Sequence, residues 1–190
     1  KMFGSMAKWV GQIDDAARVP EFVSRAFHLA VSGRPGPIVL VMPEDILAQQ
    51  AEVADLPAYS CIDAEPGAEA LSHLAAELAQ SQKPLAILGG AGWTTDAVSA
   101  FTAFAEAQDI PVAASFRAQD RMDNRHPLYV GHLGIGPDPK LAARVREADL
   151  LLVVGARLGE ATTSGYTLPV APKAPQRLIH VYPDASELGR

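Results

Sequence analysis

The chain has 190 residues, of which 48% are hydrophobic and 20% charged, and its net charge at pH 7 is −6. This balance is typical of a globular protein, and the length suffices for one good core and a partial second one. The acidic charge and the lack of a basic run argue against non-specific nucleic-acid binding. No apolar stretch approaches the roughly 18 residues of a membrane span.

Cys61 is the only cysteine of the chain, so an internal disulfide is excluded and a reducing, cytoplasmic location is expected. It lies in a polar stretch without a nearby histidine, which argues against a catalytic thiol. The start at Lys1 shows no signal peptide and no capped element. We therefore expect a section of a longer protein.

Residues 1–47 predict a strand, a helix and a second strand. Ala7–Ile13 can form the first strand, and Pro20 suits the first turn of the helix that follows. One face of that helix is apolar and contains Phe22, Val23, Ala26, Phe27 and Ala30. Ile38–Met42 is apolar throughout, as in a strand buried on both faces. We interpret these residues as the C-terminal part of an α/β domain.

Residues 48–66 are polar and rich in proline, which is typical of a linker between domains. From residue 67 to residue 190, helical patterns alternate with short apolar strands. The predicted strands are Leu85–Gly89, Ile110–Ala114, Asp149–Gly155 and Arg177–Tyr182. This alternation predicts an α/β domain with a parallel sheet flanked by helices on both faces. Residues 116–139 are expected to be a long irregular segment that carries a site or a contact.

The strongest candidate for a binding site follows the first of these strands. Gly89, Gly90 and Gly92 lead into a helix, and such a turn lets a phosphate approach the backbone at a helix N-terminus. The alternative is that the glycines merely make a tight turn. Thr95 replaces the third fingerprint glycine and Ser115 replaces the acidic residue after the second strand, so a standard NAD site is disfavoured.

Arg157 follows another strand, where it either meets a phosphate or flavin or bonds nearby carbonyls. The alternating charges of residues 117–125 are typical of a solvated patch of salt bridges. The five histidines show no metal-ligand spacing. We identify no catalytic constellation and no metal site in this sequence.

A resemblance covers nearly the whole chain. The segment Ser32-Gly33-Arg34-Pro35-Gly36-Pro37-Ile38-Val39-Leu40-Val41-Met42-Pro43-Glu44-Asp45 resembles the end of the pyrimidine-binding domain in thiamine-diphosphate-dependent enzymes of the acetolactate synthase group. Later motifs follow the order of that family's central domain, among them Gly89-Gly90-Ala91-Gly92, His126-Pro127-Leu128, Gly155-Ala156-Arg157-Leu158 and Ile179-His180-Val181.

The resemblance implies a parent enzyme that uses thiamine diphosphate and Mg²⁺ to make or break C–C bonds in 2-oxo acids. It also implies a homodimer or homotetramer. The catalytic glutamate and the residues that hold Mg²⁺ and diphosphate would lie outside this chain, so the chain alone is expected to be inactive. The alternatives are a nucleotide-binding module without thiamine chemistry and a purely structural spacer domain.

Some members of the family carry FAD in the central domain. The matching positions here are Gly89, Gly90, Gly92, Arg157 and Asp184. This sequence departs from the family pattern at residues 115–120, at His132-Leu133 and at Tyr182-Pro183-Asp184, where the family commonly has Asp-x-Asp. These departures favour weak or no FAD binding and leave FAD, ADP or an empty domain open.

Overall fold

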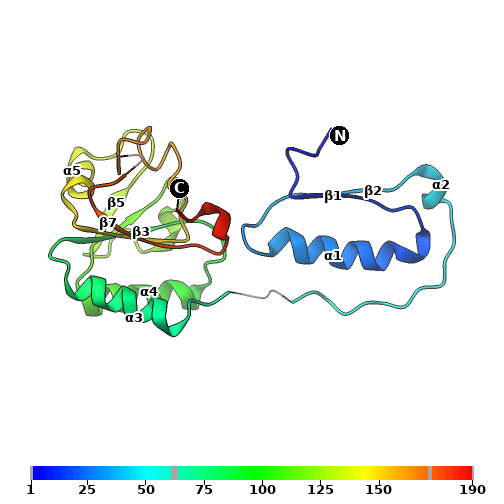
Figure 1. Cartoon of the computed structure of the whole chain (residues 1–190), viewed down its shortest axis with the longest axis horizontal. Helices are drawn as coiled ribbons and strands as arrows, with labels where there is room; N and C mark the ends of the chain where they lie inside the picture. Colours follow the sequence, from blue (N-terminus) through cyan, green and yellow to red (C-terminus); the bar gives the residue numbers. More distant parts are fainter. Residues whose placement is uncertain (1, 61–63, 171–172, 190) are drawn as a thin grey trace. The chain divides into compact units, whose positions relative to one another are not determined.

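The computed structural model describes residues 2–60, 64–170 and 173–189, so Cys61 lies outside the described residues (Figure 1). The chain divides into two compact units, Lys1–Glu65 and Pro66–Arg190. Within the described ranges, no helix combines the length and the apolar character needed to cross a membrane.

The first unit contains the predicted strand, helix and second strand. Its strands β1 (Trp9–Gln12) and β2 (Ile38–Val41) are parallel neighbours, and α1 (Val19–Val31) connects them after the short 3₁₀ helix η1 (Ala16–Arg18). Pro20 lies in the first turn of α1, as predicted. A further short helix, α2 (Glu44–Leu47), was not predicted from the sequence.

The second unit is built on one parallel sheet with the strand order β5-β4-β3-β6-β7. Its strands are β3 (Pro84–Leu88), β4 (Val112–Ala114), β5 (Tyr129–His132), β6 (Leu150–Val154) and β7 (Arg177–Val181). Its helices are α3 (Ala68–Ala79), α4 (Thr95–Gln108) and α5 (Pro139–Glu147), with the 3₁₀ helices η2 (Gln119–Arg121) and η3 (Ala185–Glu187). The predicted fold class is confirmed.

The prediction that residues 116–139 are irregular is wrong in one respect, because β5 lies within them. This strand is short, contains Gly131 and ends at the exposed His132, so it lacks the apolar run that marks the other strands. It lies at the edge of the sheet and, among the described residues, pairs only with β4, through an irregular register between Val112 and Ala113. An edge strand needs less apolar sequence than a central one.

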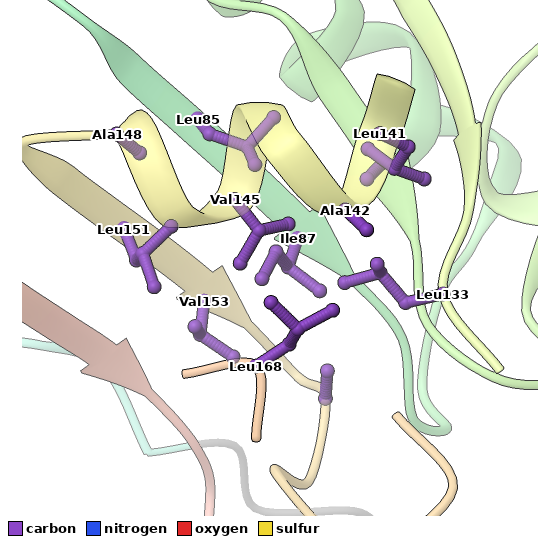
Figure 2. Packing of buried hydrophobic residues seen from close by; sticks show 12 residues of the cluster. Leu85, Ile87, Leu133, Leu141, Ala142, Val145, Ala148, Leu151, Val153 and Leu168 are labelled. Carbon is purple, nitrogen blue, oxygen red and sulfur yellow. The ribbon is translucent and has the colours of Figure 1, made fainter. Parts of the chain in front are cut away.

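Two apolar clusters cover the two faces of this sheet. One packs alternate residues of β3 and β6 against α5, and Figure 2 shows Leu85, Ile87, Leu151 and Val153 facing Val145. The opposite cluster contains the intervening strand residues, packed against α3 and α4 through Leu74, Leu78, Phe101, Phe104 and Ala105. Both faces are therefore buried, which explains why the central strands are apolar throughout.

Asp149 fixes the amino ends of the central strands. Its carboxylate accepts hydrogen bonds from the Ser81 hydroxyl and from the backbone N–H groups of Gln82 at 2.7 Å and Lys83 at 3.1 Å. These donors, with Ser81 the largest contributor, lower the pKa of Asp149 from its ordinary 3.8 to about 2. The ionised carboxylate thus joins the segment before β3 to the start of β6.

We predict that Asp149→Asn lowers the free energy of unfolding by about 1–2 kcal/mol at pH 7, because it replaces a charged acceptor of three hydrogen bonds. The pKa is lower in the folded state, so this contribution is present above about pH 4 and disappears as the pH falls toward 2. Urea unfolding at pH 7 and at pH 2.5 (roughly the folded pKa) should show the difference between wild type and variant shrinking. The exposed Glu147→Gln should change stability by less than about 0.5 kcal/mol. An Asp149→Asn deficit that does not depend on pH would contradict this account.

We also predict that backbone amides of β1 and β2 exchange faster than those of β3 and β6. Among the described residues, the buried hydrophobic side chains of the first unit are Ile13 and Ile46. The second unit instead has two extended clusters of buried hydrophobic side chains. Few buried apolar contacts mean a low free energy of local opening. Hydrogen exchange of the chain measures this directly, and equal protection in both units would contradict it.

Candidate functional site

The strand order defines one crevice in the second unit. The chain runs outward from β3 through β4 to β5, then crosses to β6 on the other side of β3. Ligands of such sheets bind where the order reverses, at the carboxyl ends of the strands. Here that position lies between the turn after β3, which begins at Gly89, and the turn after β6, which begins at Gly155.

These two turns pack directly against each other. A Cβ added at Gly90 would lie 1.9 Å from the carbonyl oxygen of Gly155, and one added at Gly155 would lie 2.5 Å from that of Gly89. Gly90 and Gly155 also have positive φ, at 77° and 69°. A Cβ at Gly89 would lie 1.9 Å from the hydroxyl of the buried Ser115. Internal packing alone therefore requires glycine at these positions.

Gly92 is different, because nothing lies within 4 Å of the position that its Cβ would take. It is held at a φ of 85° and precedes α4. The first turn of α4 already has acceptors of its own: Thr94 accepts a hydrogen bond from Ala97 N–H at 3.1 Å, and Asp96 adds a carboxylate. A negative charge at a helix N-terminus repels a phosphate. These residues do not fit the diphosphate of a dinucleotide well.

The carbonyl groups of the glycine turn also have partners. Trp93 Nε1 donates to Gly89 O at 2.8 Å, and its ring meets Phe101 edge to face. Arg121 of η2 donates to Gly90 O from Nε at 3.3 Å and from Nη2 at 3.1 Å, and its third contact is an ion pair with Asp120. The alternating charges around Arg121 predict a solvated patch, but its hydrogen bonds to Gly90 O make Arg121 a residue of the crevice.

Arg157 follows β6 and forms an ion pair with the largely buried Glu187 of η3, with 2.8 Å between Nε and Oε2. Glu187 raises the pKa of Arg157 above its ordinary value, so the guanidinium remains a cation. The side chain is 41% exposed. Glu187 was not predicted as a site residue, and a single glutamate in a polar C-terminal stretch gives no sequence signal of burial.

Asp184 caps η3, where its Oδ1 accepts a hydrogen bond from Ser186 N–H at 2.9 Å. It thus begins the same short helix that presents Glu187 to Arg157. Behind them, His180 Nε2 lies 2.8 Å from Ala156 O, which ties β7 to the turn after β6. The structure therefore connects Arg157 and Asp184 through η3, while Gly89 and Gly90 meet the β6 turn directly.

Residues 2–60, 64–170 and 173–189 contain no group of three or more His, Cys, Asp or Glu side chains arranged to hold a metal ion.

Residues 71–190 match the thiamine pyrophosphate enzyme family, central domain. The chain therefore belongs to this family, and the second unit carries its central domain.

Two curated relatives and one solved structure extend this result. The chain is 31% identical over 179 residues to the acetolactate synthase large subunit of Corynebacterium glutamicum, covering 90% of this chain and 28% of the relative. It is 30% identical to the sulfoacetaldehyde acetyltransferase of Alcaligenes xylosoxydans, and the alignment covers 99% of this chain and 31% of that protein. Its fold resembles the crystal structure of benzoylformate decarboxylase from Polynucleobacter necessarius, with a TM-score of 0.76 and 24% sequence identity. That superposition covers 100% of this chain and 35% of the decarboxylase chain. The chain thus spans about a third of the length of these proteins.

We predict that Gly90→Ala is far more destabilising than Gly92→Ala. Both substitutions place a side chain at positive φ, which costs about 1–2 kcal/mol. Only Gly90→Ala also drives a Cβ into the backbone of Gly155, so its cost should exceed about 3 kcal/mol. Urea unfolding of the two variants gives the comparison, with soluble yield as the readout if Gly90→Ala does not fold. Equal stability of the two variants would contradict the proposed packing of the turns.

Proposed function

We propose that this chain is a section of a thiamine-diphosphate-dependent enzyme that acts on 2-oxo acids, by acetolactate synthase-like C–C bond formation or by decarboxylation. The observation that carries the proposal is the family match over residues 71–190. The alignments to the acetolactate synthase large subunit and to the sulfoacetaldehyde acetyltransferase support it, since they cover 90% and 99% of this chain and so extend over both units. We further propose a cytoplasmic enzyme that assembles as a homodimer or homotetramer.

In the proposed enzyme, thiamine diphosphate with Mg²⁺ would supply a nucleophilic thiazolium ylid and a cationic ring that serves as the electron sink. The second unit contributes architecture rather than reacting groups. Its sheet is buried on both faces, and its carboxyl edge is fixed by the contacts of Arg121 and Arg157.

The proposal predicts that the purified 190-residue chain does not turn over pyruvate in the presence of thiamine diphosphate and Mg²⁺. The full-length protein that contains this chain should consume a 2-oxo acid under the same conditions. Both reactions release CO₂, and the second product is an aldehyde after simple decarboxylation or a 2-acyl-2-hydroxy acid after C–C bond formation. Product analysis by NMR or mass spectrometry distinguishes these outcomes. Turnover by the 190-residue chain would refute the assignment of catalysis to other parts of the protein.

We also propose that the crevice binds FAD weakly or not at all. Three features support this: Gly89 and Gly90 are required by internal packing, Asp96 opposes a phosphate at the start of α4, and Arg157 is paired with Glu187. Two features favour the alternative of a nucleotide site, namely the open space at Gly92 and the exposed part of Arg157. The assignment of Gly89, Gly90, Gly92, Arg157 and Asp184 to a cofactor remains a prediction.

Calorimetric titration of the folded chain with FAD and with ADP tests this proposal. We expect no binding tighter than about 100 μM for either ligand. Stoichiometric FAD binding near 1 μM, roughly −8 kcal/mol, would overturn it. In that case Arg157→Ala should weaken binding, and an unchanged affinity would remove Arg157 from the site.

A further inference from the structure

A hollow of about 500 Å³ lies at the amino edge of the central sheet, opposite the crevice. Its floor includes Pro84 at the start of β3, Pro111 before β4 and Ala148 before β6. One wall is a single stripe of α5, formed by Lys140, Ala143, Arg144 and Glu147. The volume is within the range of small-molecule sites, about 300–1,000 Å³.

The charges on this hollow are not balanced. Its lining has three cations, Lys83, Lys140 and Arg144, and two carboxylates, Asp109 and Glu147, which leaves one net positive charge. Lys83 is paired with Glu147 at 3.8 Å between Nζ and Oε2. Among the described residues, neither the Lys140 ammonium nor the Arg144 guanidinium has an ion-pair partner.

Lys140 is placed unfavourably on α5, whereas Arg144 lies in the last turn, where the helix dipole favours a cation. They are four residues apart on α5, so two like charges lie on the same face. Lys140 is in the first turn, where the helix dipole disfavours a cation. A bound anion would relieve both effects, and a guanidinium beside an ammonium suits a carboxylate.

The uncharged residues of the lining indicate which chemical group the rest of the ligand should carry. Pro84 and Pro111 have no N–H group to donate, and Ala143 and Ala148 add methyl groups. These groups form an apolar patch in the hollow, although the charged side chains and Gln82 make the lining as a whole slightly more polar than apolar. We propose that this hollow binds a small monocarboxylate with a short aliphatic body, its carboxylate on Arg144 and Lys140 and its chain on the proline and alanine floor. This inference does not depend on the proposed enzymatic role.

The test uses the ¹⁵N-labelled 190-residue chain and three probes. The first is 3-methylbutanoate, the second its uncharged isostere 3-methylbutanamide, and the third inorganic phosphate, an anion without an apolar body. We expect 3-methylbutanoate to give saturable amide shifts at Lys83, Asp109 and Ala143, with a Kd of about 1–10 mM. The amide and phosphate should each bind at least about tenfold more weakly, because each lacks one of the two interactions.

Two arginine variants on α5 provide the matched comparison. Arg144→Gln should raise the Kd for 3-methylbutanoate at least about tenfold, which corresponds to the loss of a charge-assisted contact. Arg146→Gln removes an exposed arginine that does not line the hollow and should leave the Kd within about twofold. Both spectra also report whether the variant is folded.

The proposal is overturned by any of four results. These are no saturable shift up to about 50 mM probe, shifts that cluster away from the hollow, equal binding of the acid and its amide or phosphate, and an Arg144→Gln variant that binds like Arg146→Gln.

Discussion

The contact between the turns after β3 and β6 is the constraint on which the second unit depends. These two strands are the centre of the sheet, and the hydrogen bond from Gly89 N–H to Val154 O at 3.1 Å extends their pairing past the last strand residue. The backbones can approach so closely only because neither Gly90 nor Gly155 has a side chain. The outer strands and both apolar clusters are built on this pair.

The same constraint bears on how glycine-rich turns are interpreted. A Gly-Gly-x-Gly segment after a buried strand is typical of nucleotide sites, where it lets a phosphate approach the backbone. In this chain the space beside Gly89 and Gly90 is taken by Ser115 and Gly155, and the turn carbonyls accept hydrogen bonds from Trp93 and Arg121. The pattern of glycines is thus satisfied by the protein itself, and only Gly92 lies next to open space.

Apolar runs made the central strands predictable from sequence, because burial on both faces leaves no polar position in them. The edge strand β5 was missed since it is short and half-buried. The candidate site was harder to predict from the sequence than the strands. Arg157 could be identified because it directly follows an apolar strand. Its ion pair with Glu187 and the hydrogen bond from Arg121 to Gly90 O could not, because both depend on loops whose conformation no local sequence pattern specifies. The alternating charges around Arg121 resembled an ordinary solvated surface.

The place of β3 in the sheet also has a bearing on synthesis. It is the first strand of its sheet to leave the ribosome, yet it lies at the centre of the sheet. One of its two neighbours, β6, is the fourth of the five strands to be synthesised. At about 5–20 residues per second, the interval between Leu88 and Leu150 lasts about 3–12 s. During translation, one edge of an apolar strand therefore stays unpaired for seconds. Nascent chains of this protein should accordingly engage chaperones that bind exposed hydrophobic strands until Val154 has emerged.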